Sequence, residues 1–426
     1  MSFVGLVQET RLFRRTWKFD LTAGFTVAIV ALPLALGFGI TSGAGAASGL
    51  ITAIVAGFIA ALLGGSNYQV SGPTGAMTVI LVPIIGTYGT TSLLALGFFA
   101  GAFILLMGAL KLGRFIERVP WSVMEGFTLG IALVIALQQL PLVFEIPKGE
   151  GSEALVIAWN TVSDAAASPI NWVSISLVLL TLSLIWAWGG VKRRLAFAKN
   201  VPASALAVLL VTILVALTGL DVAKVGSLPA DELFRFELGM PSVPIMALLF
   251  PAFSIALLGA IESLLAARVA DSMAHRRDQE SAQTHKPNKE LVGQGFATIG
   301  SALFGGMPAT GAIARTGVNV EAGARTRYSS ALHAVFLLIM VMFLAPLVSQ
   351  IPMAALAGVL LATSWRIANP ESIKEAMQTI WVERLSYLAT AVAVLAIDLI
   401  WGLVIGVAVH IVSAKLSSPR SPTDGK

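Results

Sequence analysis

The chain has 426 residues, of which 56% are hydrophobic and 12% charged, and its mean hydropathy is +0.85. Ordinary soluble domains carry about 25% charged residues, so this composition excludes a soluble globular protein and predicts a multi-pass membrane protein. The apolar runs are about 15 to 22 residues long, which fits helices that cross a hydrocarbon core of roughly 30 Å.

The formal net charge is +5 and the isoelectric point about 9.6. The basic residues stand at the ends of apolar runs, as they do when positive charge holds loops on the cytoplasmic side, so no nucleic acid is expected as a partner. The chain has no cysteine and only four scattered histidines, so no disulfide, metal site or other cofactor is predicted. The sequence shows no nucleophile–base pair that would support an enzyme, so none is predicted.

The first half of the chain is predicted to cross the membrane about seven times. Residues 1–20 form a basic, amphipathic lead-in that we expect to stay in the cytoplasm. Residues 21–220 hold the spans, and an acidic loop, Glu145–Asp164, suits the outside. The predicted spans are Leu21–Ile40, Ser48–Leu63, Gly75–Tyr88, Ser92–Leu110, Pro120–Phe144, Trp172–Trp188 and Val201–Leu220.

The second half begins on the opposite side, because an odd number of spans precedes it. A loop at 221–242 is expected outside, residues 243–414 hold about seven further spans, and residues 415–426 are expected to be a cytoplasmic tail. The polar stretch Asp271–Glu290 connects the first two of these spans. The predicted spans are Val243–Arg268, Leu291–Leu303, Ala312–Ala322, Ser329–Val348, Pro352–Trp365, Leu385–Ala396 and Leu399–Ala414.

Two stretches break the apolar pattern at matching places in the two halves, SNYQVSGPTGAM at Ser66–Met77 and GGMPATGAIARTGVNVEAGARTR at Gly305–Arg327. Their glycines and prolines interrupt a helix, and the residues that follow can start one. The N-terminus of a helix presents free N–H groups and a partial positive charge, which favour an anion. Paired breaks are typical of the central site of a transporter, although breaks that merely ease helix packing are an alternative.

The string ELVGQGFATIGSALFGGMPATGAIARTGVNVEAGARTR at Glu290–Arg327 closely resembles the corresponding region of the sulfate permease (SulP) family of anion transporters. Four further stretches resemble that family and spread the similarity over essentially the whole chain. They are DLTAGFTVAIVALPLALGFGITSG at Asp20–Gly43, VSGPTGAMTVIL at Val70–Leu81, LLGAIESLLAARVAD at Leu257–Asp271 and IPMAALAGVLLATSW at Ile351–Trp365.

This resemblance implies an all-α integral membrane fold of fourteen transmembrane segments in two inverted seven-segment repeats. A core domain, holding the first to fourth and eighth to eleventh segments, would rock against a gate domain, and two short β pieces would precede the half-helices. Members of the family move sulfate, bicarbonate, chloride or dicarboxylates, by symport with H⁺ or Na⁺ or by exchange. Family chains usually continue into a STAS domain, so we expect this sequence to represent the membrane domain without it.

The predicted substrate site consists of the starts of the two half-helices and one aromatic residue. Arg315 lies one turn into the second half-helix, at a position that resembles the arginine beside the anion in the family. A guanidinium within the membrane needs an acid, a substrate or a water-filled cavity, and snorkelling to the cytoplasm is the alternative. By resemblance, Phe38 would face the apolar side of the substrate, although packing alone would also explain it. The substrate-binding candidates are Phe38, Thr74, Gly75, Ala76, Met77, Gly311, Ala312, Ile313, Ala314 and Arg315.

Glu262 is the candidate for proton coupling, because it is the one acid in its span ahead of the basic end. A carboxyl group in apolar surroundings favours its protonated form, so it could carry a proton with the anion. In the sodium-coupled relatives that this region resembles, an aspartate is followed one turn later by a hydroxyl residue. Here Glu262 is followed by Ala266, which favours H⁺ over Na⁺ as the coupling ion. A structural ion pair of Glu262 with Arg315 or Arg268 is the alternative.

The sequence therefore predicts a proton-coupled symporter of small anions in a bacterial inner membrane, with both termini in the cytoplasm. Its partners would be an inorganic or organic anion, H⁺ (with Na⁺ as second choice) and the lipid bilayer, and a homodimer is left open. Rival hypotheses are an anion exchanger or channel of the same fold, or a nucleobase:cation symporter. Tyr68 and Gln69, which precede the first half-helix, are not counted among the site residues.

Overall fold

The computed structural model describes residues 3–116, 118–151, 153–194, 201–226, 244–277 and 284–417. This part of the chain is mostly helical, as predicted, because a backbone in lipid must satisfy its own hydrogen bonds. The helices are α1 (Phe3–Thr41), α2 (Ala46–Ile51), the π-helical η1 (Thr52–Ala56), α3 (Gly57–Leu63), α4 (Gly75–Tyr88), α5 (Ser92–Ala109), α6 (Gly113–Ile116), α7 (Trp121–Leu137), α8 (Leu140–Phe144), α9 (Ala154–Ala167), α10 (Trp172–Arg194), α11 (Ala203–Thr218), α12 (Ile245–Arg277), α13 (Pro287–Leu303), α14 (Ile313–Glu321), α15 (Tyr328–Val348), α16 (Met353–Ala368), α17 (Pro370–Gln378), α18 (Trp381–Ala396) and α19 (Leu399–Ser417).

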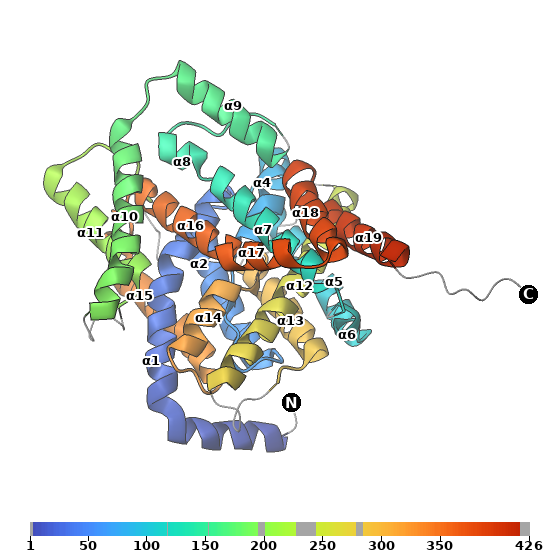
Figure 1. Ribbon diagram of the computed structural model, residues 1–426. Coiled ribbons are helices and arrows are strands. Elements are labelled where there is room, and N and C mark those ends of the chain that lie inside the picture. The colour runs from blue at the N-terminus through green and yellow to red at the C-terminus, as the bar shows by residue number, and fades with distance from the viewer. Residues whose placement is uncertain are drawn as a thin grey trace, which may run out of the picture.

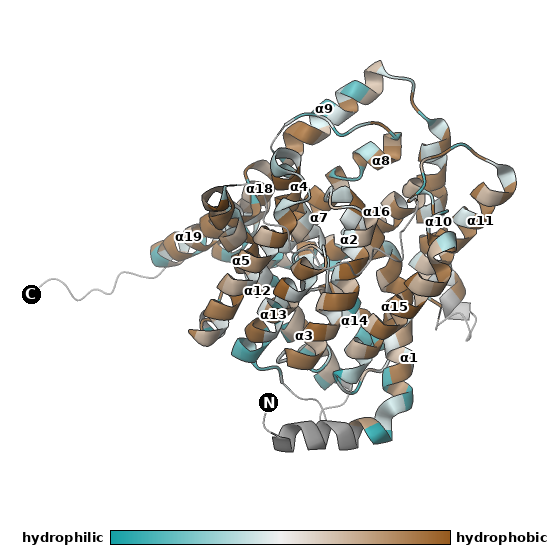
Figure 2. Ribbon diagram, turned by 180° about the vertical axis from the view of Figure 1, so that it is seen from behind, coloured by the Kyte–Doolittle hydropathy of each residue, from teal (hydrophilic) through white to brown (hydrophobic). Residues whose placement is uncertain are grey.

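Many of these helices are built to cross a membrane. Within the described ranges, eight helical stretches are long and apolar enough to do so, and α4 and α11 are shorter apolar helices. Figure 2 shows the hydrophobic residues along the long helices and the hydrophilic ones near the helix ends and loops. Many large apolar side chains are also exposed, among them Trp159, Leu217, Met246 and Phe343, as expected for a surface that faces lipid.

The helices sort into two groups by packing. In the first helix group, which comprises α1–α5 and α12–α15, α13 packs against α5 and α3, and α15 packs against α1. In the second helix group, which comprises α7–α11 and α16–α19, α18 packs against α7 and α19, and α16 packs against α10 (Figure 1). The two groups meet where α1 lies beside α16 and α11, and where α4 lies beside α7.

Two short strands join the halves of the chain at the predicted breaks. Strand β1 (Ser71–Gly72) pairs antiparallel with β2 (Thr310–Gly311), so that Ser71 lies opposite Gly311 and Gly72 opposite Thr310. The two short β pieces ahead of the half-helices are therefore present. Their backbone hydrogen bonds hold together two chain segments that would otherwise be irregular inside a membrane protein.

The π-helical turn η1 ties the first half to the second break. Thr52 Oγ1 accepts a hydrogen bond from the backbone N–H of Met307 at 2.8 Å, and Ser48 Oγ donates to the carbonyl of Gly305 at 2.8 Å. A π-bulge offsets the helix by one residue and is frequent at functional sites. Nothing in the sequence pattern indicated it, because its position depends on where the partner segment lies.

Several predicted boundaries are wrong. The amphipathic lead-in is not separate from the first span, since α1 runs unbroken from Phe3 to Thr41 and turns sharply along its length (Figure 1). Asp20 lies within α1, and its carboxylate accepts hydrogen bonds from Arg325 N at 2.7 Å and Thr326 Oγ1 at 2.8 Å. A buried carboxylate at this place ties α1 to the loop after α14.

Two predicted loops contain helix. The acidic stretch Glu145–Asp164 includes most of α9, a helix of 14 residues, because the alanines of this segment are strong helix formers. In the connector Asp271–Glu290, α12 continues to Arg277 and α13 begins at Pro287, a favoured first residue of a helix. Residues 278–283 of the connector, 227–242 of the predicted outer loop and 418–426 of the predicted tail lie outside the described residues.

Candidate functional site

The starts of α4 and α14 are brought together by the pairing of β1 with β2. Helix α4 begins at Gly75 after extended Thr74, and α14 begins at Ile313 after extended Ala312, and no side chain caps either N-terminus. The first N–H groups of a helix have no partner within the helix. Two uncapped helix N-termini, each carrying a partial positive charge, therefore lie next to one junction.

Some of the predicted donors are already used. Ala312, which was expected to open the second half-helix, instead donates its N–H to the carbonyl of Val70 at 2.9 Å. The N–H of Gly311 donates to Ser263 Oγ at 3.0 Å. Sequence reasoning missed Ser263, although a hydroxyl residue directly after Glu262 in an apolar helix was a signal. The backbone N–H groups that remain for a ligand at the N-terminus of α14 are those of Ile313, Ala314 and Arg315.

Glu262 of α12 bonds to both breaks. Its Oε2 accepts hydrogen bonds from Thr74 Oγ1 at 3.0 Å and from Thr310 Oγ1 at 2.8 Å, and the two hydroxyl oxygens are 3.2 Å apart. Thr310 was missed by the sequence analysis, because it lies before the glycine at which the second site was expected to begin. Because the carboxyl group accepts a hydrogen bond from one hydroxyl of each half, a change in its protonation can affect the start of both half-helices.

Arg315 is buried and points toward the first break. Only 1% of it is exposed, so it does not snorkel. Its Nη2 donates to the carbonyl of Pro73 at 2.7 Å, while Nη1 has no hydrogen-bond partner in the described structure. The guanidinium lies against Gly72, whose φ is 153° and where an added Cβ would be 2.6 Å from Nη1. The space for this cation therefore depends on glycine at 72.

The alternative of an ion pair between Glu262 and Arg315 is not what the structure has. The two charges attract each other, but the hydrogen bonds of Glu262 go to Thr74 and Thr310, and that of Arg315 goes to Pro73. Arg315 Nη1 is thus a buried charged donor without a protein acceptor, which is costly unless water or an anion accepts from it.

Phe38, predicted from the resemblance to face the substrate, packs at the start of α4. It is 5% exposed, and a Cβ added to Gly75 would lie 3.3 Å from Phe38 Cε1 and would overlap Ile135 Cδ1. Ile135 comes from α7 of the second helix group and was not predicted. Phe38 and Ile135 form a tight apolar contact over Gly75 where the two helix groups meet.

Gln69 and His333 are polar residues that the sequence analysis did not place in the site. Gln69 lies directly against Gly311, where an added Cβ would overlap its Nε2, and both of its amide atoms lack partners within the described residues. His333 of α15 is fully buried beside Gly57, and neither of its ring nitrogens has a hydrogen-bond partner there. Unpaired buried polar groups are uncommon and often mark water or ligand sites.

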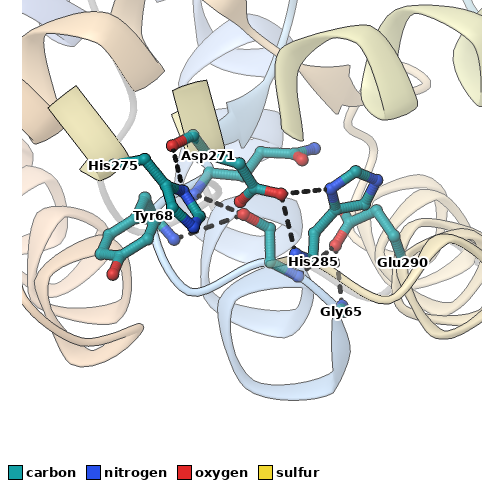
Figure 3. A network of polar contacts seen from close by, with 8 residues as sticks. Gly65, Tyr68, Asp271, His275, His285 and Glu290 are labelled. Atoms are coloured by element: carbon teal, nitrogen blue, oxygen red, sulfur yellow. Dashed lines mark hydrogen bonds and ion pairs between the residues drawn. The ribbon is translucent and has the colours of Figure 1, made fainter. Parts of the chain in front are cut away.

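A polar network behind the first break holds its loop in place (Figure 3). Glu290 Oε2 accepts hydrogen bonds from the N–H groups of Gly65 at 2.7 Å and Ser66 at 2.9 Å. Asp271 Oδ2 accepts from the N–H of His285 at 2.8 Å and lies 2.6 Å from His285 Nδ1. Residues predicted to be a plain polar connector therefore fix the end of α12 and the loop that leads to β1.

A cavity of about 760 Å³ lies between the two helix groups. It follows α1 from Thr22 to Leu34 and the end of α14 on one side, and α10, α11 and α16 on the other. Its charged lining residues are Glu321 of α14 and Arg366 of α16, one from each helix group. The lining is Thr22, Thr26, Val30, Leu34, Ile185, Trp186, Pro202, Ala203, Ser204, Val318, Glu321, Ala322, Val359, Ala362, Thr363, Trp365, Arg366, Asn369 and Pro370.

The model of the sulfate permease family matches residues 17–390 of this chain. The chain belongs to the sulfate permease family. This permease is 35% identical over 412 residues to the putative sulfate transporter YvdB of Bacillus subtilis, covering 95% of this chain and 74% of that protein. It is 33% identical over 359 residues to the bicarbonate transporter BicA of Picosynechococcus, covering 81% of this chain and 61% of that one.

Solved structures agree with this assignment. The transmembrane domain of a cyanobacterial bicarbonate transporter BicA superposes on this permease with a TM-score of 0.79 at 31% identity, covering 91% of this chain and 98% of that one. Murine Slc26a9, an anion transporter, shares the fold with a TM-score of 0.77 at 16% identity. The superposition covers 93% of this chain and 68% of Slc26a9. This permease is therefore a multi-pass membrane protein of a transporter family and not an enzyme, and the resemblance seen in its sequence is confirmed.

Proposed function

We propose that this permease is a secondary active transporter of a small anion, which binds between the N-termini of α4 and α14. The observation that carries this proposal is the pairing of β1 with β2, which brings two uncapped helix starts together beside Arg315. Backbone N–H groups, two helix dipoles and a free guanidinium Nη1 suit an anion in a site of low dielectric constant. Phe38 would contact its apolar side.

The membrane topology of the proposal has fourteen segments. Residues 21–220 supply α1, α2–α3, α4, α5, α7, α10 and α11, and residues 243–414 supply α12, α13, α14, α15, α16, α18 and α19. The two sets are inverted repeats, with the loop at 221–242 outside. Residues 1–20 and 415–426 are cytoplasmic, since basic residues flank these ends. The membrane is the inner membrane of a bacterium, which the bacterial relatives support.

Transport proceeds by alternating access, in which the first helix group is the core domain and the second is the gate domain. The large cavity lies along α1 from Thr22 to Leu34. Farther along α1, Phe38 meets Gly75 and Ile135 in a tight contact. A cavity that runs along the domain interface from one side and ends at a tight contact between the two groups is what a rocking carrier requires.

The candidate substrates are sulfate, bicarbonate, chloride and dicarboxylates. Sulfate and bicarbonate have the direct support of the relatives named above. A site made of backbone donors and one cation selects for charge and size, so an uncharged ring such as uracil is disfavoured.

Counterflow in proteoliposomes tests the proposal. Vesicles loaded with unlabelled sulfate, bicarbonate, chloride, fumarate or uracil are given the same compound with an isotope label. We expect accumulation of label for at least one anion and none for uracil. Accumulation of uracil alone would identify a nucleobase carrier, and no accumulation of any compound would contradict transport of these solutes. Electrical currents far above carrier turnover would indicate a channel, and strict dependence on an anion on the far side would indicate an exchanger.

Proton coupling through Glu262 is the mechanism that we propose for symport. When the carboxyl group is ionised it accepts from both Thr74 and Thr310. Protonation removes the negative charge of the carboxylate, which weakens its hydrogen bonds to both hydroxyls, and a proton on Oε2 itself would force at least one of them to rearrange. Because the two threonines stand directly before the two half-helices, the proton and the anion are linked through the same residues.

The Glu262→Gln variant is expected to lose stimulation of anion uptake by an inward proton gradient, while counterflow without a gradient persists. Glutamine keeps the size of the side chain but cannot exchange a proton. The measurement is uptake into vesicles at equal and unequal pH, with Glu371→Gln of exposed α17 as the matched control. Retained pH-gradient dependence in Glu262→Gln would move proton coupling to another residue, and a response to a Na⁺ gradient alone would replace H⁺ with Na⁺.

A further inference from the structure

A second cavity, of about 330 Å³, lies at the C-terminal end of α1, beyond the residues that line the large one. It is formed by the end of α1 and the outer half of α4 in the first helix group, and by α7, α8 and α9 in the second. Its lining residues are Ile40, Thr41, Ser42, Gly43, Val79, Val82, Pro83, Ile85, Gly86, Leu137, Gln138, Pro141, Leu142, Lys148, Ala154 and Ile157.

The walls of this cavity are apolar, and its few hydroxyl groups are already used. Thr41 Oγ1 donates to the carbonyl of Gly37 at 2.9 Å, and Ser42 Oγ donates to the carbonyl of Gly39 at 2.8 Å. A bare inorganic anion would lose its hydration there and gain few donors. The cavity therefore differs in chemistry from the junction of the two half-helices.

Lys148 is the charged residue of the lining, and it stands in the segment between α8 and α9. Among the described residues, neither its ammonium group nor the side-chain amide of Gln138 has a hydrogen-bond partner. Lys148 is exposed at the rim, yet enough of it is covered that desolvation lowers the pKa of its ammonium group from the ordinary value. No neighbouring carboxylate of the described residues compensates for the desolvation of the ammonium group. An anionic group on a ligand would supply that compensation.

We propose that this cavity binds an amphiphilic anion, a carboxylate or sulfonate on a compact hydrophobic body. The anionic group is held by Lys148 and Gln138 at the rim, and the body lies between α4 and the α7–α8 segment. The volume falls within the range of about 300 to 1,000 Å³ that is usual for small-molecule sites. The apolar walls would bind the hydrophobic body of the ligand, and the Lys148 ammonium group at their edge would bind its anionic group.

An occupant of this cavity would touch both helix groups close to their tight contact. Val79 lies one turn beyond Gly75 in α4, and Leu137 lies two residues beyond Ile135 in α7. A ligand wedged there holds α4 and α7 at their present separation. Such a ligand inhibits transport without resembling the substrate; this inhibition rests on the proposed function, whereas binding itself does not.

The test uses naphthalene-2-sulfonate and the purified full chain in detergent, with isothermal titration calorimetry as the readout. We expect binding at one site, and a loss of about tenfold or more in affinity in Lys148→Met, because a charge-assisted hydrogen bond is removed. Lys224→Met is the control, since Lys224 is exposed and bonds to Gln350 away from the cavity. Uncharged naphthalene-2-sulfonamide is expected to bind at least tenfold more weakly, roughly as Lys148→Met binds the sulfonate.

Gly86→Leu supplies an independent variant that fills the cavity. Gly86 lines it, and a Cβ added there meets no atom within 4 Å, so the larger side chain enters open space and also favours the helix. We expect this variant to fold and to lose binding. Absence of binding by the native chain, or native affinity in both Lys148→Met and Gly86→Leu, would overturn the proposal. Calorimetry gives this answer even if counterflow shows no anion transport, so the two proposals fail separately.

Discussion

Replacing Arg315 with alanine is expected to reduce anion uptake by about two orders of magnitude, through weaker binding of the substrate. Removal of one partner from a buried charged interaction costs about 3 to 5 kcal/mol, and each 1.4 kcal/mol is about tenfold in affinity. Arg315 supplies the free Nη1 donor and also holds the carbonyl of Pro73, directly before Thr74. The measurement is the concentration dependence of counterflow.

Arg315→Lys is expected to recover part of the affinity, because it restores the charge but not the forked geometry. Arg384→Ala is the matched control, since Arg384 is exposed on α18. Thermal unfolding of each purified variant separates loss of binding from loss of fold. If Arg315→Ala folds and binds its substrate with native affinity, the guanidinium has only a structural role and the site lies elsewhere.

Gly75→Ala is expected to lower the transport rate by about tenfold to a hundredfold. The added Cβ would overlap Ile135 Cδ1 and approach Phe38 Cε1 to 3.3 Å, and overpacking of this kind costs about 1 to 3 kcal/mol. The overlap falls at the N-terminus of α4, where the anion would bind, and at the contact between the two helix groups. Initial rates of anion uptake measure the effect.

A second substitution tests whether the overlap is the cause. Ile135→Ala removes the atoms that the new Cβ would meet, so Gly75→Ala together with Ile135→Ala is expected to transport faster than Gly75→Ala alone. Gly86→Ala is the control on the same helix, because its Cβ meets nothing within 4 Å and its rate should equal that of the native chain. Equal rates for the single and double variants would show that the contact with Ile135 does not limit transport.

The residues around the breaks show where prediction from sequence stopped. Thr74, Gly75 and Arg315 were predicted because clustered glycines and prolines interrupt the apolar pattern there, and because arginine is rare within a span. Thr310 was missed because it lies before the glycine at which the second site was expected to begin, and Ser263 because its position after Glu262 in an apolar helix was not used as a signal. Their importance follows from Glu262 and Gly311, the groups to which they bond. Ile135 was missed because one isoleucine in an apolar helix resembles any other.

The helix boundaries failed for a related reason. Asp20, Asp271 and Glu290 were assigned to hydrophilic ends and a connector, because charge usually marks the limit of a span. Asp20 and Glu290 instead accept backbone N–H groups from a distant segment, and Asp271 accepts the N–H of His285 within the same connector. These hydrogen bonds stabilise the carboxylates inside the protein. The helices can then continue through or start near residues that looked like loops.

The sequence by itself determined the membrane class, the alternation of apolar runs with basic ends, the two breaks and the family. These features depend on the free energy of placing each residue in lipid or water and on which residues can continue a helix. Only the tertiary structure decided that β1 pairs with β2, that Glu262 bonds to a threonine from each half, and that Arg315 points at Pro73. Those are contacts between residues far apart in the chain, which composition and periodicity do not encode.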